Sequence, residues 1–253
     1  MDFAAYLGIA LGIGAIIVGN VLEGGTIFHL LQPSAALIVF GGTLGATLLS
    51  FSWEDVTGAV RALGKAFRTL PSSPEEVIET VIDLLTKTRK GGVLALEPEI
   101  GKAPDPFLRK GLTLLLDGMD AATIRAVLGQ EMSTYETTMK RAARVFEAAG
   151  GYAPTIGILG AVLGLIQVMR NVTDPTMIGQ GIAVAFVATI YGVGSANLIF
   201  LPLSKKIINR VNEEVFLMEL VLEGVLGIEG GVNPFVLRTK LESFLAEHRK
   251  GKR

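Results

Sequence analysis

Few side chains in this sequence could carry out chemistry, and they do not combine into a catalytic or metal-binding set. The 253 residues include no cysteine and only two histidines, His29 and His248. Thiolate chemistry is therefore excluded, and a histidine-rich metal site is not expected. No nucleophile, base and orienting group lie together, and Gly91-Gly92 lacks the spacing of a phosphate-binding loop. We predict that the chain is not an enzyme and uses no cofactor or metal.

The residues of interest lie instead in long uncharged segments. From Ala148 to Met169 there are 22 residues without Asp, Glu, Lys, Arg or His, yet this run contains Pro154. Proline cannot donate a backbone hydrogen bond, so carbonyl oxygens around Gly150 lose their helical partner. Two interpretations of Pro154 stay open: a simple bend, or freed carbonyl oxygens that line a water-containing cavity.

Thr189 lies in the middle of another uncharged segment and also has two interpretations. Its hydroxyl could bond to its own helix four residues back, or it could line a path for ions. Small residues recur at helical spacing in two segments: Gly8 and Gly12, and Gly157, Gly160 and Gly164. Such spacing lets membrane helices approach closely, and helix packing is the simplest role for each glycine taken singly.

Four segments are long and apolar enough to cross a membrane: residues 3–22, 34–51, 148–169 and 177–203. Half of the chain is hydrophobic and only 19% is charged, which favours a membrane protein. None of the four segments has an ionisable residue in its interior, although proteins that move ions generally need one at membrane depth. Either the chain moves no ions or a partner provides the titrating carboxylate.

The basic residues predict the orientation. Apart from Arg170, the 23 lysines and arginines fall in two blocks, 13 within residues 53–147 and nine within residues 204–253. By the positive-inside rule, both blocks and the N-terminus are cytoplasmic, and the short connections face the other side. The net charge of −1 gives no reason to expect a nucleic-acid partner.

The segment between the second and third spans has the composition of soluble helices. In PSSPEEVIETVIDLLTKTRKGG, Ser73 and Glu76 predict a capping box, and the two final glycines end the helix. Asp105 predicts a second helix start. Asp120 predicts a short helix, which precedes a longer helix over residues 131–149 that continues into the third span.

No strand-like alternation is sustained anywhere in the sequence. We therefore predict an all-α integral membrane protein with four transmembrane helices, a helical cytoplasmic domain between the second and third, and a helical cytoplasmic tail. The predicted domains are an N-terminal hairpin (1–52), a cytoplasmic domain (53–147), a second hairpin (148–203) and a tail (204–253).

Two stretches, YAPTIGILGAVLGLIQVMRNVTDP and GIAVAFVATIYGVGSANLIFLPLSKK, closely resemble the third and fourth spans of the MotA/PomA stator proteins of the bacterial flagellar motor. The resemblance covers the whole chain, including the cytoplasmic stretch RKGGVLALEPE. ExbB and TolQ proteins, from the wider MotA/TolQ/ExbB proton channel superfamily, share the last hairpin but resemble three-span proteins. The additional N-terminal span favours the MotA/PomA family.

The resemblance implies an ion-driven rotary stator in the bacterial inner membrane. Five such subunits would surround two copies of a single-span, peptidoglycan-binding MotB-type partner, whose membrane aspartate carries the ion. It also implies that the partner moves on the surface around Gly160, and that the cytoplasmic domain contacts the rotor switch protein FliG. The implied residue roles are an ion pathway at Thr155, Ala161, Ala188 and Thr189, coupling at Pro154 and Pro202, and rotor contact at Arg89, Lys90, Glu97 and Glu99.

The identity of the ion depends on two of these positions. Sodium-type relatives present threonines where this chain has Ala161 and Ala188, so fewer oxygens can replace the hydration shell of a sodium ion. We therefore predict protons. The alternatives are a sodium-driven stator of the same family, an ExbB/TolQ-like energiser of outer-membrane transport, and a passive scaffold whose glycines only pack helices.

Overall fold

The computed structural model describes residues 3–70, 72–103 and 105–251, and every regular element in these residues is a helix. The chain forms two compact units, each built from two separate stretches: Met1–Thr69 with Met139–Asn209, and Leu70–Thr138 with Arg210–Arg253. The long helices α8 (Ala121–Arg170) and α10 (Leu201–Glu229) contribute to both units. The prediction of an all-α chain is confirmed for the described residues.

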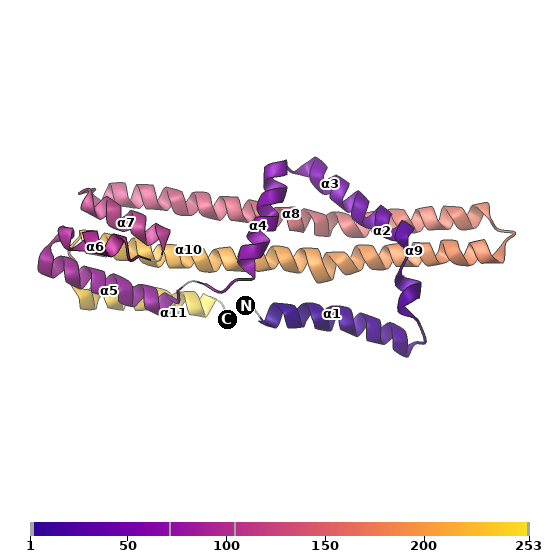
Figure 1. Ribbon diagram of the computed structural model, residues 1–253, viewed down its shortest axis with the longest axis horizontal. Coiled ribbons are helices and arrows are strands. Elements are labelled where there is room, and N and C mark those ends of the chain that lie inside the picture. Colours follow the sequence, from indigo (N-terminus) through magenta and orange to yellow (C-terminus); the bar gives the residue numbers. More distant parts are fainter. Residues whose placement is uncertain (1–2, 71, 104, 252–253) are drawn as a thin grey trace. The chain divides into compact units, whose positions relative to one another are not determined.

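The first unit also contains α1 (Phe3–Leu22), η1 (Ile27–Leu30), α2 (Pro33–Ala36), η2 (Leu37–Gly41), α3 (Gly42–Ser50), α4 (Trp53–Ala66), α9 (Pro175–Ser195) and η4 (Ala196–Phe200). Elements α2, η2 and α3 form one continuous helix, and so do α9, η4 and α10. Both η2 and η4 are short π-helical stretches, in which the backbone hydrogen bonds span five residues. Within this unit α8 and α9 run side by side in opposite directions, and α4 crosses α8 in this view (Figure 1).

Among the described residues, three helical stretches are long and apolar enough to cross a membrane: Pro33–Ser50, Ala121–Arg170 and Pro175–Glu229. They correspond to the second, third and fourth predicted segments, and the first of these stretches ends at Ser50, one residue before the predicted end. The first predicted segment lies in α1, where Tyr6–Leu22 forms a shorter apolar helix. The count of four spans therefore stays a prediction.

Among its described residues, the first unit buries mainly small side chains and exposes much apolar surface. One small buried cluster joins the helix of residues 33–50 to α9 and consists of Ala35, Val39, Val187 and Ala188. Large apolar side chains such as Leu37, Leu49 and Phe186 are exposed on the same helices. A surface of this kind is expected where the surrounding medium is lipid or a partner helix.

The second unit consists of α5 (Pro74–Gly91), η3 (Val93–Leu96), α6 (Glu97–Ile100), α7 (Pro106–Leu116) and α11 (Pro234–Gly251), with the first part of α8 and most of α10. Its core is a continuous cluster of large side chains, in which Leu85, Leu112 and Leu220 are completely buried. Burying each such leucine contributes about 1.5–3 kcal/mol, so this unit has the character of a water-soluble helical domain.

The predicted helix starts are confirmed in the second unit. Glu76 N–H donates to Ser73 Oγ at 3.2 Å and Ser73 N–H donates to Glu76 Oε2 at 2.9 Å, which completes the capping box of α5. Asp105 caps α7 by accepting a hydrogen bond from Phe107 N–H at 3.0 Å. The helix α5 ends at a glycine turn, where Gly92 has a φ of 74° that favours glycine.

The prediction of a separate short helix after Asp120 is wrong. Asp120 does cap a helix, because its Oδ1 accepts from Thr123 N–H at 2.9 Å, but that helix is α8, which continues without a break to Arg170. The stretch contains only one isolated glycine before residue 150, Gly129, and no proline before Pro154. A single glycine costs about 1 kcal/mol relative to alanine, which does not end a helix.

Candidate ion-path and coupling site

Helices α8 and α9 contact each other backbone to backbone along four glycines, which we call the glycine seam: Gly157, Gly164, Gly181 and Gly192. A Cβ atom added to Gly157 would lie 2.9 Å from the carbonyl oxygen of Ala188. One added to Gly192 would lie 2.6 Å from the carbonyl oxygen of Ala153. Backbone atoms cannot turn aside as a flexible side chain can, so these positions fit only glycine unless the helices separate.

Gly160 is enclosed by its own chain. A Cβ atom added there would lie 2.8 Å from the Cβ of Ala188 and 3.4 Å from Ile38 in η2. Ala188 is completely buried. This location agrees with a packing role for Gly160, but it corrects the expectation that a partner moves on the surface around it, because α9 and η2 already occupy that space.

The two threonines of the predicted ion pathway bond to their own helices. Thr189 Oγ1 donates to the carbonyl oxygen of Ala185 at 3.2 Å, and Thr155 Oγ1 donates to that of Tyr152 at 2.8 Å. Thr155 is exposed and Thr189 is half-buried. Because Ala188 is completely buried, the four predicted pathway residues do not share one exposed face of the chain.

The two predicted coupling prolines are linked through one glycine. Pro154 lies inside α8 and cannot donate to the carbonyl oxygen of Gly150, four residues earlier. Gly150 packs directly on Leu201, since an added Cβ would lie 2.7 Å from Leu201 Cδ2. Leu201 immediately precedes Pro202 in the chain. The weakened turn of α8 therefore lies against the weakened turn at the start of α10.

The π-helical stretch η4 ends two residues before Pro202 and was not predicted from the sequence. Its final hydrogen bond runs from Leu201 N–H to the carbonyl oxygen of Ala196, five residues earlier. Proline at position 202 has no backbone N–H that could continue the α-helical hydrogen bonds. This proline was the one feature of the sequence near η4 that indicated an irregular helix. Irregular hydrogen bonding thus surrounds both prolines.

Two tyrosines that sequence analysis missed fasten the helix of residues 33–50 to the long helices. Ser50 Oγ and Tyr152 OH share a 2.8 Å hydrogen bond, which joins α3 to α8 two residues before Pro154. The Tyr191 hydroxyl donates to the carbonyl oxygen of Leu30 and accepts from Gln32 N–H at 3.3 Å. The helix of residues 33–50 is therefore held to the other helices of this unit close to both of its ends.

The predicted rotor-contact residues lie in the second unit, around the turn between α5 and α6. Arg89 and Lys90 are exposed in the last turn of α5, and Glu97 is exposed at the start of α6. Between them, Leu96 is completely buried in the core, whereas Leu94 is 75% exposed. Leu96 therefore anchors a short segment that displays charges of both signs.

Glu99 differs from the other three rotor-contact residues because it is held by ion pairs inside the unit. Its carboxylate lies 3.1 Å from Lys102 Nζ and 3.1 Å from Lys87 Nζ, and only 17% of its side chain is exposed. Hydrogen bonds from Lys102 and then Lys87 lower the pKa of Glu99. Glu99 therefore positions the α6 segment against α5.

Comparison with known proteins assigns the family. A profile of the MotA/TolQ/ExbB proton channel family matches residues 99–220, and a profile of the N-terminal region of motility protein A matches residues 6–92. Chemotaxis protein PomA of Vibrio alginolyticus is 36% identical over 251 residues, which cover 99% of this chain and 98% of that protein. The chain belongs to the MotA/PomA family of flagellar stator proteins.

Solved MotA/PomA structures extend the likeness to the whole fold. A chain of C. jejuni MotAB matches with a TM-score of 0.92 and 30% identity, and 96% of each chain is covered. A chain of the flagellar MotAB stator complex from Bacillus subtilis matches with a TM-score of 0.89 and 33% identity, and 95% of each chain is covered. The predicted resemblance to MotA/PomA proteins is therefore confirmed.

Proposed function

We propose that this chain is the subunit of a flagellar stator that assembles with a MotB-type partner and couples inward proton flow to rotation of the rotor. The observation that carries this proposal is the match to MotAB stator complexes over at least 95% of the chain. Five copies around two copies of the partner would form the complex in the bacterial inner membrane.

In the proposed topology the membrane is crossed four times. The spans are α1, the continuous helix of residues 33–50, the second half of α8, and α9 with η4 and the start of α10. The basic residues gather between the second and third spans and after the fourth, which supports cytoplasmic N- and C-termini. Residues 1–52 and 148–203 then form the membrane hairpins, and residues 53–147 and 204–253 are cytoplasmic.

The proposed ion is carried by an aspartate of the partner. The exposed faces of α8 and α9 carry apolar side chains, including Ile158, Val162 and Ile190, so a titrating group must come from outside this chain. Thr189 is the polar side chain that α9 would offer to this aspartate near the middle of the membrane. Ala161 and Ala188 add no oxygen that could replace the hydration shell of sodium, which supports protons.

Coupling is assigned to the two prolines. A membrane helix with a missing backbone hydrogen bond bends at lower energy than an intact one. Pro154 and Pro202 weaken α8 and α10 at neighbouring turns, joined by the contact between Gly150 and Leu201. A change in charge at the partner's aspartate could therefore move both helices together.

Torque is assigned to the exposed charges of the second unit. Arg89, Lys90 and Glu97 would meet complementary charges on FliG, while Glu99 holds their segment in place through Lys87 and Lys102. Exposed charges at a moving interface guide partners without binding them tightly, because water and salt screen them.

Ion flux through the complex with its partner tests the assigned path. We expect Thr189→Val to abolish most of the flux and the motility of a strain that depends on this protein. Thr173→Val, in the exposed connection between α8 and α9, is the matched control and should have no effect. Unchanged flux in Thr189→Val would show that the path lies elsewhere.

Swimming speed distinguishes the proton proposal from the sodium-driven alternative. In a strain powered only by this stator, speed should be the same with and without sodium at constant pH. A speed that rises with sodium concentration would overturn the proton assignment and leave the stator assignment intact.

A further inference from the structure

Helix α4 of the first unit has a cationic side that the proposed stator function does not use. Arg61, Lys65 and Arg68 are spaced four and then three residues apart, so they lie on one side of the helix, and all three are exposed. The last helical turn extends as far as Arg68, because its N–H donates to the carbonyl oxygen of Lys65 at 3.0 Å. We call these three residues the cationic row.

In the described part of the chain, no acid forms an ion pair with the cationic row. The Arg61 guanidinium donates to Thr57 of its own helix, to the carbonyl oxygen at 3.4 Å and to the hydroxyl at 3.3 Å. The acid Asp55 of α4 pairs instead with Arg141 of α8, at 2.9 Å. Glu54 is exposed on the same side, but it lies about 10 Å along the helix from Arg61. The row therefore keeps an excess of positive charge.

Two large apolar side chains are exposed beside the cationic row. Trp53 is 72% exposed and Val60, seven residues further on, is 65% exposed, so they share one side of the helix. The opposite side of α4 is buried through three alanines, Ala59, Ala62 and Ala66. Exposed cations next to an exposed tryptophan are typical of helices that lie at the surface of a bilayer.

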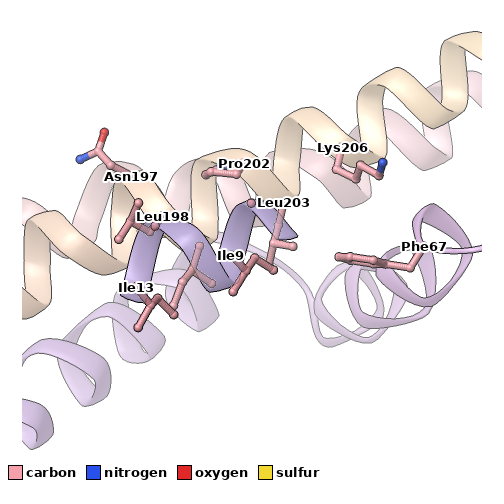
Figure 2. A pocket seen from close by; sticks show the side chains of 11 residues that line it. Ile9, Ile13, Phe67, Asn197, Leu198, Pro202, Leu203 and Lys206 are labelled. Atoms are coloured by element: carbon pink, nitrogen blue, oxygen red, sulfur yellow. The ribbon is translucent and has the colours of Figure 1, made fainter. Parts of the chain in front are cut away.

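Both ends of α4 lie beside the end of a proposed span. Ser52 caps α4 two residues after the second span, which ends at Ser50. At the other end, the ring centres of Phe67 and Tyr6 are 5.6 Å apart, and Tyr6 lies in the first turns of the first span. Figure 2 shows the Phe67 side chain reaching toward the pocket between α1 and the opposite helix. A helix that joins two span ends on one side of the membrane must follow the membrane surface.

We propose that the exposed side of α4 binds anionic phospholipids of this membrane surface, with the cationic row at their phosphates and Trp53 between headgroups and acyl chains. The proposal rests on the proposed topology, in which both ends of α4 reach the same surface. Each lysine or arginine close to an anionic surface strengthens binding about fivefold. A zwitterionic headgroup gains less, because its own positive group meets the cationic row.

Trp53 serves as the reporter on the assembled complex, because it is the single tryptophan of the chain. The complex with its partner is reconstituted in mixtures of phosphatidylglycerol and phosphatidylcholine in which one of the two lipids is brominated. The quenching of a Trp53→Phe complex is subtracted, which removes the signal of the partner. We expect brominated phosphatidylglycerol to quench Trp53 more strongly than an equal amount of brominated phosphatidylcholine, and salt should reduce the difference.

Three variants separate the cationic row from charge in general. Arg61→Gln/Lys65→Gln/Arg68→Gln should reduce the preference for phosphatidylglycerol at least fivefold. Arg61→Lys/Lys65→Arg/Arg68→Lys keeps the three charges and should preserve the preference. Arg89→Gln/Lys90→Gln removes two exposed cations of the second unit and should also preserve it. All these side chains are exposed, so the variants should fold and assemble.

Three results would overturn the proposal. The first is equal quenching of Trp53 by the two lipids, and the second is a preference that survives the loss of all three cations. The third comes from Val60→Cys, which introduces a unique cysteine into the chain. Efficient disulfide formation between two copies of this variant would show that a second copy covers this side of α4.

A second tryptophan position separates this proposal from the topology on which it rests. Trp53→Phe/Leu44→Trp moves the indole to an exposed position within the second span. If both lipids quench this indole and neither quenches Trp53, the lipid site on α4 is wrong while the span stands. If neither indole is quenched, the proposed topology is wrong as well. Ion flux through the complex tests the stator function independently of both.

Discussion

The contact between α8 and α9 in the first unit is made largely of backbone, whereas the contacts in the second unit are made of large side chains. At Gly157 and Gly192 the two helix backbones leave no space for a methyl group. In the second unit, Leu85 and Leu220 belong to one continuous cluster of buried aliphatic and aromatic residues. The same secondary structure is therefore held together in two different ways.

In the proposed topology the first unit lies in lipid and the second in water, and this difference in medium accounts for the two kinds of packing. In water, burying large apolar side chains is the main favourable contribution to packing, so a soluble helical domain gains most from leucine, isoleucine and phenylalanine. In lipid the free-energy gain from burying apolar side chains disappears. Helices then associate through close van der Waals packing, which small residues permit. Both kinds of packing occur along one helix, since α8 contributes to both units.

The largest expected loss of stability comes from shortening a core side chain of the second unit. Leu220→Ala should lower the free energy of unfolding by about 2–5 kcal/mol, because it leaves a cavity among packed neighbours. Leu94→Ala, at a 75% exposed leucine, should change it by less than about 0.5 kcal/mol. Thermal unfolding of the purified complex followed by circular dichroism measures both, and similar losses would contradict a side-chain-packed core.

A smaller loss is expected from adding one methyl group to the glycine seam. Gly192→Ala should destabilise the complex by about 1–3 kcal/mol, since its Cβ would meet the carbonyl oxygen of Ala153 at 2.6 Å. Gly179→Ala, on the same helix with no atom within 4 Å, should be neutral or stabilising by up to about 1 kcal/mol. Size-exclusion chromatography after heating measures how much of each variant stays assembled. If Gly192→Ala were as harmless as Gly179→Ala, the backbone contact between α8 and α9 would be refuted.

Pro154→Ala separates coupling from packing within the first unit. It restores a donor for the carbonyl oxygen of Gly150, so stability should be unchanged or raised by about 1 kcal/mol. Rotation should nevertheless be strongly impaired. Pro175→Ala is the control, because Pro175 lies in the first turn of α9 and replaces no helical hydrogen bond. Bead rotation at matched stator number is the measurement, and equal loss of assembly and rotation would return Pro154 to a structural role.

The smallest effect is expected at Glu219, a carboxylate at the edge of the side-chain-packed core. Burial, and then the nearby Glu136 and Glu223, raise the pKa of Glu219 above its ordinary value of 4.5. Because the pKa is raised in the folded state, the folded state loses stability as pH rises from the ordinary value of 4.5 towards the raised pKa, and none of this loss is present below 4.5. Glu219→Gln should therefore raise the melting temperature at pH 7 but not below pH 4.5. Exposed Glu229→Gln should leave it unchanged at either pH.

The sequence predicted those features that depend on local chemistry. The capping box of Ser73 and Glu76, the cap at Asp105 and the glycine stop after Gly91 each involve residues within four positions of one another. The membrane segments follow from length and composition alone. The prediction of a separate helix after Asp120 was wrong because a single glycine does not end a long helix that is stabilised by tertiary packing.

Features that depend on contact between distant segments could not be predicted. The stretch RKGGVLALEPE gives no indication that Glu99 is less exposed than its neighbours. In the fold, η3 reverses the chain direction and Glu99 forms ion pairs with Lys87 and Lys102. Neither the hydrogen bond between Ser50 and Tyr152 nor the contact between Gly150 and Leu201 has a local signal, because each joins segments separated by at least 50 residues. Family resemblance pointed to Pro154 and Pro202, while their proximity came only from the fold.

The π-helical stretches η2 and η4 change how this chain tolerates insertions and deletions. A π-helical turn holds one more residue than an α-helical turn, so removing one residue from 196–200 could restore a regular α-helix while both flanking helices keep their register. The same deletion beside Gly192 would rotate the following residues by about 100° and carry the seam away from α8. Among relatives of this chain, single-residue gaps in the membrane helices should therefore collect at residues 37–41 and 196–200.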